Sequence, residues 1–141
     1  MRTALHTDLP TILELLSDND LPDAGVADYV EKFILEFNDG QLIACAGLEL
    51  HGASALLRSV AVSTSQRSSG LGARLVKAQL EAARALEATS VSLLTTTAEM
   101  YFPRFGFEIV PRSTLPTELD NSLELRGICP DSAVAMHRKL E

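Results

Sequence analysis

The sequence contains no tryptophan, only two cysteines and no long hydrophobic run. Cys45 and Cys129 lack C-x-x-C spacing, which argues against a disulfide scaffold or a zinc site and indicates reduced thiols, with Cys45 packed in the core. His6, His51 and His137 are scattered, so we expect no metal site. No apolar stretch approaches the roughly 20 residues that span a bilayer, and the first residues lack the apolar core of a secretory signal. These absences predict a cytoplasmic protein with no membrane partner.

Positive charge is also scarce. Twelve Lys and Arg residues stand against nineteen Asp and Glu residues, which gives a net charge of −7. No cluster of basic residues could neutralise several backbone phosphates, so we do not expect a nucleic-acid partner. A chain of 141 residues, 46% of them apolar, can bury one core. We therefore predict a single domain over residues 1–141.

The hydrophobic periodicity predicts strands that alternate with helices. Strands are expected at residues 2–5, in two runs within 32–50 joined by a turn at 38–40, and at 53–62, 90–97, 106–111 and 132–140. Helices are expected at 8–18 with Asp8 as N-cap, at 21–33 and 70–86, and as a short piece at 98–105; 113–123 is either a short helix or an ordered loop. The order predicts a mixed α/β domain, antiparallel in its first half, with one crossover to a parallel strand.

The loop of this crossover, "SQRSSGLG" at residues 65–72, has the composition of an anion site. The first N–H groups of a helix have no intrahelical partner, and the peptide dipoles place partial positive charge there. Gly70 and Gly72 would let a diphosphate approach the main chain, while Arg67, Ser68 and Ser69 can add donors. The loop matches neither G-x-x-x-x-G-K-[ST] nor G-x-G-x-x-G, which argues against a P-loop or a dinucleotide fold.

The pattern Arg67-x-x-Gly70-x-Gly72 resembles the pyrophosphate-binding signature of the GNAT superfamily of acetyl-CoA-dependent N-acetyltransferases. "RTALHTDLPTI", the "NDG" and "HG" turns and "YFPRFGF" resemble other segments of that family in the same order, so the resemblance covers nearly the whole chain. It implies the GNAT fold, an α/β domain whose mixed, mostly antiparallel sheet of six to seven strands is flanked by about four helices. "GLELHGASALLRSVAV", "LLTTTAEMYFPRFGF" and "ICPDSAVAM" look most like a bacterial branch named for arsenic-resistance N-acetyltransferases, itself similar to the acetyltransferase domain of N-acetylglutamate synthase.

The resemblance implies acetyl-CoA as cosubstrate, bound where the strand at 90–97 diverges from Val62. It also implies that the backbone N–H of Val60 binds the oxyanion formed when an amine attacks the thioester, and such a donor is worth ~10²–10³ in rate. The implied cofactor contacts, mostly through backbone N–H groups, are Val60, Ala61, Val62, Arg67, Ser68, Ser69, Gly70, Leu71, Gly72 and Ala73.

Arg58 stands in an apolar row. The two-residue period of a strand places Leu56, Arg58, Val60 and Val62 on one face. A buried charge needs a partner, and there are two alternatives: an internal salt bridge with Glu49, or a carboxylate of the substrate. We favour the substrate slightly, because this strand of the family borders the active cleft.

The chain departs from the family at its acid and base. Many members carry a Tyr four residues before the Gly of the Gly-Phe pair. In this chain Phe102 occupies that position. Tyr101 precedes it by one residue, which on a helix turns the side chain by roughly 100°. The Glu that is the base in some members falls at Leu56. No side chain is secured as acid or base, and we expect catalysis by positioning and oxyanion stabilisation.

We therefore expect an enzyme that moves an acetyl group to the amine of a small, amino-acid-like anionic metabolite, with a link to arsenic resistance implied by the resemblance. One alternative is an acyl-CoA sensor without turnover. Direct arsenite capture by thiols ranks last, because two cysteines cannot form a three-thiolate site. The acceptor and the oligomeric state stay open, with a homodimer as one alternative.

Overall fold

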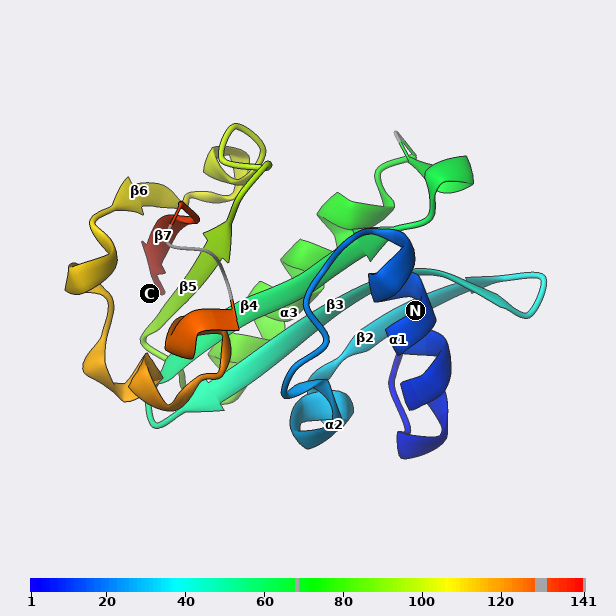
Figure 1. The fold of residues 1–141 in the computed structure, drawn as a ribbon, viewed down its shortest axis with the longest axis horizontal. Coiled ribbons are helices and arrows are strands. Elements are labelled where there is room, and N and C mark those ends of the chain that lie inside the picture. Colours follow the sequence, from blue (N-terminus) through cyan, green and yellow to red (C-terminus); the bar gives the residue numbers. More distant parts are fainter. Residues whose placement is uncertain (68, 129–131, 141) are drawn as a thin grey trace.

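The computed structural model describes residues 1–67, 69–128 and 132–140. Within these residues, seven strands form one sheet in the order β1-β2-β3-β4-β5-β7-β6 (Figure 1). All neighbouring strands are antiparallel except β4 and β5, which are parallel. The mixed, mostly antiparallel sheet predicted from the sequence is thereby confirmed. The strands are β1 Arg2–Thr3, β2 Ile34–Asn38, β3 Gln41–His51, β4 Ser54–Val62, β5 Ser90–Thr95, β6 Glu108–Val110 and β7 Val134–Lys139.

Three α-helices occur in the described residues: α1 Leu9–Asp18, α2 Val26–Tyr29 and α3 Leu71–Ala85. The helix predicted over 21–33 is shorter, because Gly25 adopts a left-handed conformation and the chain continues after α2 as the 3-10 turn η2 Val30–Lys32. The remaining helical turns are short: 3-10 turns η1 His6–Asp8, η3 Thr64–Gln66, η4 Phe102–Phe105, η5 Arg112–Thr114 and η6 Thr117–Asn121, and the π-turn η7 Glu124–Ile128. No helix within the described ranges combines the length and hydropathy needed to cross a bilayer.

The sheet is covered on both faces (Figure 1). On one face, α3 packs through Val76, Leu80 and Ala83 against a core that includes Leu57 and Phe105. On the other face, α1, α2 and η2 cover a second core, to which the sheet contributes Leu35, Cys45 and Ala61. Residues far apart in sequence therefore meet on each side of β3 and β4.

The parallel strands β4 and β5 pair over only three residues. Ser54–Leu56 pair with Ser90–Ser92. Beyond these residues β4 continues to Val62 and β5 to Thr95, but the two strands no longer pair with each other. Figure 1 shows the two strands diverging from this end. The predicted divergence of the strand at 90–97 from Val62 is confirmed.

A β-bulge interrupts β4. Cys45 pairs with Ala61 but Gly47 pairs with Arg58, so Ser59 and Val60 together lie opposite Ala46. Ser59 has φ +57°, a left-handed conformation that few residues other than glycine adopt. The bulge reverses the alternation of side chains after Arg58.

This reversal corrects one prediction. Leu56, Arg58, Val60 and Val62 do not share a face. Val60 packs with Leu57 against the α3 side, whereas Arg58 lies near Gly25, which precedes α2 on the other side. The two-residue period holds only while the strand stays regular, and the extra residue shifts its phase by one.

The N-terminus shows a second difference. Asp8 stands before α1 as predicted, but its carboxylate does not cap the helix. It accepts the Leu5 backbone N–H at 2.8 Å and the Arg2 guanidinium at 2.8 and 2.9 Å. These hydrogen bonds lower the pKa of Asp8 to about 2. The side chain therefore joins β1 to the turn before α1.

Candidate active site

A cleft of about 820 Å³ opens where β4 and β5 diverge. The N-terminus of α3 and the end of β4 form one wall, and the end of β5 and residues 97–104 form the other. The cleft is the place at which the sequence predicts the cofactor. The predicted site residues that line it are Arg58, Val60, Val62, Arg67, Gly70, Leu71, Gly72 and Ala73.

The beginning of α3 has the geometry of an anion site. Gly70 is the N-cap residue with φ +82°, which favours glycine, and α3 starts at Leu71. A Cβ on Gly72 would lie 3.2 Å from the Tyr101 hydroxyl and 3.5 Å from Val62 Cγ2, so glycine keeps this point of the cleft open. The first N–H groups of a fifteen-residue helix lie beside that opening.

The other predicted phosphate contacts have partners within the protein. Arg67 Nη2 donates to Asn19 Oδ1 at 2.7 Å, and Arg67 Nε donates to the Val62 carbonyl at 3.3 Å. Ser69 Oγ donates to the Gln66 carbonyl. Ser68 lies outside the described residues. Arg67 thus joins the crossover loop to Asn19, the residue that ends α1, and both residues line the cleft.

The three predicted contacts on β4 divide between the two faces of the sheet. Val60 and Val62 line the cleft, whereas Ala61 is 3% exposed and packs in the core on the α1 side. Beyond Leu56 the main chain of β4 has no β5 partner in the described register. That edge could therefore pair with an amide-bearing ligand as an added strand would.

Tyr101 and Phe102 lie in different environments. Phe102 is 7% exposed and packs with Phe105 and Phe107, while Tyr101 is half-buried and directs its hydroxyl toward Gly72. Burial raises the pKa of Tyr101, although Arg104 opposes that shift, so the phenol stays protonated at neutral pH. The Arg104 guanidinium lies 4.4 Å from the Tyr101 ring centroid and so covers this ring. Tyr101 is thus a neutral donor beside the start of α3.

Arg58 forms the internal ion pair that was one of its two predicted alternatives. Its Nη1 donates to Glu49 Oε2 at 2.7 Å, and both side chains are fully buried. Its Nε donates to Ser59 Oγ at 3.1 Å and lies 3.4 Å from Glu124 Oε1. Arg58 still lines the cleft, and its Nη2 is buried without a hydrogen-bond partner among the described residues. One donor of the guanidinium is therefore left for a further group.

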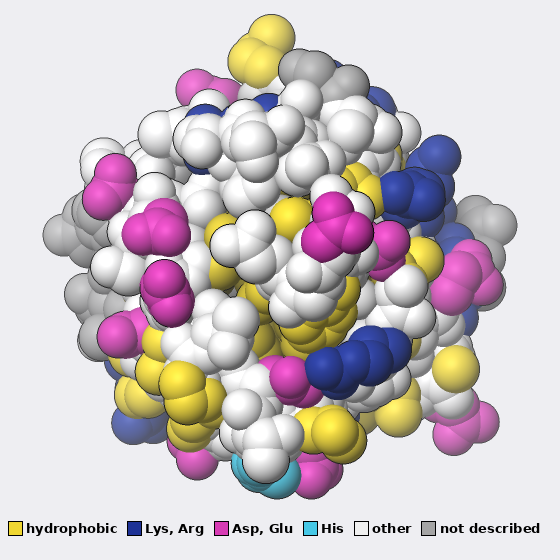
Figure 2. Space-filling model, turned by 90° about the vertical axis from the view of Figure 1, so that its right-hand side faces the viewer, with side chains coloured by type: hydrophobic (Ala, Val, Ile, Leu, Met, Phe, Trp, Pro, Cys, Tyr) yellow, Lys and Arg dark blue, Asp and Glu magenta, His cyan; other side chains and the backbone are white. Residues whose placement is uncertain are grey.

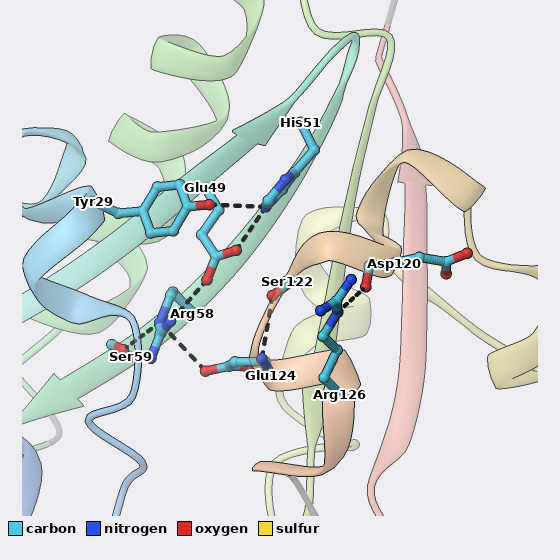
Figure 3. Close-up of polar contacts among 9 residues, drawn as sticks. All are labelled: Tyr29, Glu49, His51, Arg58, Ser59, Asp120, Ser122, Glu124 and Arg126. Carbon is cyan, nitrogen blue, oxygen red and sulfur yellow. Dashed lines mark hydrogen bonds and ion pairs between the residues drawn. The ribbon is translucent and has the colours of Figure 1, made fainter.

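The Arg58–Glu49 ion pair continues into further polar contacts on either side (Figure 3). His51 Nε2 lies 2.7 Å from Glu49 Oε1, and the Tyr29 hydroxyl lies 3.5 Å from the same nitrogen. On the other side of Arg58, the Glu124 N–H donates to Ser122 Oγ at 3.3 Å. We refer to Tyr29, Glu49, His51, Arg58 and Glu124 as the buried polar cluster.

Three of these residues were absent from the sequence analysis as site residues: Tyr29, His51 and Glu124. Glu124 lies on η7, 66 positions after Arg58 in the sequence. Its segment "NSLELRG" carries no motif, and no local pattern could have placed it beside β4. A π-turn is rare and is frequently found at functional sites. The π-turn η7 is therefore a local sign that Glu124 belongs to a site, but it is visible only in the structure.

Cys45 has the environment predicted for it. It is fully buried, its Sγ lies 3.3 Å from the Ser59 carbonyl, and burial raises its pKa to about 12. A thiol with so high a pKa is a poor nucleophile and a poor metalloid ligand. Cys129 lies outside the described residues.

Charged side chains of both signs are interspersed on the side of the molecule shown in Figure 2. Basic side chains occur in separate small groups between acidic ones, around a recess of apolar side chains. Inside the cleft, the individual residues that could meet an anionic ligand include Arg58, Arg67 and Arg104.

Comparison with known proteins agrees with this geometry. A family model described as an acetyltransferase (GNAT) domain matches residues 30–109. An amino-acid acetyltransferase of Pasteurella multocida (strain Pm70) is 29% identical over 125 residues, which cover 82% of this chain and 28% of that protein.

The solved structures show the same fold. N-acetylglutamate synthase from Neisseria gonorrhoeae, complexed with coenzyme A and N-acetyl-glutamate, has a TM-score of 0.83 and 22% identity over 99% of this chain and 34% of that one. Rv2747 from Mycobacterium tuberculosis, in complex with CoA, has a TM-score of 0.80 and 22% identity over 99% and 98% of the two chains. This chain thus spans about a third of the length of the first structure. With the family model matching more than half of its residues, the chain belongs to the GNAT acetyltransferase domain family.

Proposed function

We propose that the protein transfers the acetyl group of acetyl-CoA to the α-amino group of a small amino acid. The observation that carries this proposal is the cleft between the diverging strands β4 and β5, with the open N-terminus of α3 in its wall. The amino-acid acceptor is supported by the relatives, which include an amino-acid acetyltransferase and an N-acetylglutamate synthase.

Acetyl-CoA supplies an activated acyl group, and the residues of this chain hold it. The backbone N–H groups at Gly70–Ala73 bind the diphosphate, assisted by the protonated hydroxyl of Tyr101. Arg67 reaches the same region from the crossover loop once it leaves Asn19. The free edge of β4 pairs with the pantetheine amides.

The backbone N–H of Val60 stabilises negative charge on the acetyl oxygen, as the family resemblance implies. Val60 lies on the cleft side of the bulge, so the unusual conformation of Ser59 determines which way this part of β4 faces. Catalysis then depends on orientation and oxyanion stabilisation, and water or the acceptor carries the proton. Tyr101, beside Gly72 at the phosphate end, is not assigned to the sulfur.

The unpartnered Nη2 of Arg58 binds the carboxylate of the acceptor. A hydrogen bond from Nη2 to a carboxylate would give a partner to the one guanidinium nitrogen of Arg58 that has none among the described residues. Because Glu49 and Glu124 offset the charge of Arg58, this contact suits a zwitterionic amino acid better than a multiply charged anion.

The test is release of free thiol from acetyl-CoA with a panel of amino acids, including L-glutamate and L-glutamine, and their decarboxylated amines. We expect release that depends on the amino acid and is at least tenfold slower with the matching amine. Binding of CoA with no amine-dependent release would identify an acyl-CoA sensor instead. A role in arsenic resistance, the finer function implied by the resemblance, is tested separately by the survival on arsenite of cells that produce the protein.

A further inference from the structure

Glu49 shares its buried carboxylate between two basic side chains. Its Oε2 accepts from Arg58 Nη1 and its Oε1 lies against His51 Nε2, each at 2.7 Å. Glu49 is fully buried, whereas the His51 side chain is 10% exposed. His51 is therefore the basic group through which solvent protons reach the buried polar cluster.

The charge of the cluster depends on His51. When the imidazole is neutral, the single positive charge of Arg58 faces two carboxylates, Glu49 and Glu124. When it is protonated, His51 adds a second positive charge beside Glu49. A carboxylate that binds Arg58 Nη2 adds one more negative charge to a desolvated site, and such a charge is costly unless it is compensated.

We propose that His51, acting through Glu49, is a positioning residue that makes binding of the acceptor carboxylate at Arg58 depend on pH, with tighter binding when the imidazole is protonated. This inference rests on the proposed function, because it assumes that Arg58 meets a carboxylate. His51 has no contact with the acetyl group in this scheme; it changes the charge that the carboxylate experiences.

Within the described residues, the imidazole of His51 contacts two titratable side chains directly, the Glu49 carboxylate and the Tyr29 hydroxyl. Burial raises the pKa of Tyr29, and Glu49 and Asp28 raise it further, so its phenol stays protonated at neutral pH. Arg58 and Glu124 lie behind Glu49, and the Glu118 carboxylate accepts the Ala53 N–H and the Ser54 hydroxyl at the adjacent hairpin. Glu49 is therefore the group that joins His51 to Arg58.

The experiment measures the dissociation constant of N-acetyl-L-glutamine by calorimetry, in the presence of CoA, from pH 5.5 to 8.5. This probe has no amino group and a single carboxylate, which is ionised throughout that range. We expect the wild-type dissociation constant to rise about tenfold across this pH range. This is the size expected for the loss of attraction between the charge on His51 and the bound carboxylate, which are separated by Glu49 and Arg58, at an effective dielectric constant near 20.

Variants of His51 give opposite expectations. His51→Gln, always neutral, should bind weakly at every pH, whereas His51→Lys, always charged, should bind as tightly as the wild type at pH 5.5 throughout. His6→Gln is the matched control, because His6 is an exposed histidine paired with Glu31 far from Arg58; it should keep the wild-type rise. Thermal melting checks that each variant folds.

The outcomes separate the two proposals. If the dissociation constant still rises with pH in His51→Gln, or in His51→Lys where the first variant does not fold, the role of His51 is overturned and the proposed function stays intact. A wild-type dissociation constant that does not change with pH also overturns the role of His51 alone. If neither N-acetyl-L-glutamate, N-acetyl-L-glutamine nor N-acetylglycine binds at any pH, Arg58 is not a carboxylate site and both proposals fall.

Discussion

The two ends of the cleft are built from different parts of the chain. The end at α3 uses backbone groups and two glycines, and its geometry follows from a helix that begins at Leu71. The end at Arg58 uses charged side chains from β3, β4 and η7 that are buried against one another. Backbone donors at a helix terminus are present whenever the helix forms, whereas a buried ion cluster forms only if distant elements meet.

The largest effect is expected when the Glu49 carboxylate is removed from the Arg58 end of the cleft. Glu49→Ala leaves the buried Arg58 with Glu124, at 3.4 Å, as its remaining charged partner and Ser59 Oγ as its hydrogen-bond acceptor among the described residues, so we expect a loss of about 3 kcal/mol in the free energy of unfolding. Urea denaturation measures it. The control Glu81→Ala removes the exposed pair with Arg84 on α3 and should cost less than about 0.5 kcal/mol. Equal losses in the two variants would show that the Arg58 pair is no more important than a surface pair.

The next effect concerns the backbone end. Gly70→Val places a β-branched residue at φ +82°, which costs about 1–3 kcal/mol and disturbs the start of α3; CoA affinity should fall at least about tenfold by calorimetry. Gly40→Val is a close control, because Gly40 has φ +77° and equally open surroundings but lies in the β2–β3 turn. It should destabilise the fold without changing CoA affinity. A similar loss of affinity in both variants would remove the start of α3 from the proposed site.

A smaller effect is expected at Tyr101, whose hydroxyl lies beside Gly72 at the backbone end. Tyr101→Phe removes one neutral donor beside Gly72, so the dissociation constant of CoA should rise about fivefold while kcat changes less than about threefold. Tyr29→Phe, on the opposite side of the sheet, should leave CoA binding unchanged. A hundredfold loss of kcat in Tyr101→Phe would make its hydroxyl the missing acid and would contradict catalysis by positioning.

The smallest effect is expected at the ion pair of Asp8 with Arg2, which is more exposed than the buried pair of Arg58 with Glu49. The folded pKa of Asp8, about 2, lies below its reference value of 3.8, so its contribution is present above about pH 4 and is lost as the pH falls toward 2. Because solvent screens this pair, Asp8→Asn should lower stability at pH 7 by no more than about 1 kcal/mol. At pH 2 the variant should match the wild type in thermal melting, as should Asp18→Asn at both pH values. An equal deficit at pH 2 and pH 7 would mean that the charge of Asp8 is not the cause.

Sequence reasoning succeeded where structure is local. The turn at residues 38–40 and the helix that starts after Gly70 follow from short patterns with a physical cause, whereas the divergence of β5 from β4 was implied by the family resemblance. It was less accurate for residues 21–33, where Gly25 and irregular turns shorten the expected helix. It was wrong about the shared face of Arg58 and Val60, because a bulge at a serine leaves no signature in the sequence.

The sequence by itself determined the order of the elements and the two glycines at the start of α3, because these depend on hydrophobic periodicity and backbone freedom over a few residues. Only the tertiary structure decided that Arg58 faces Glu49 and Glu124, and that Nη2 alone is left without a partner among the described residues. The physical reason is that the partners of a buried charge are chosen by the packing of elements far apart in the chain, and here by one extra residue in β4.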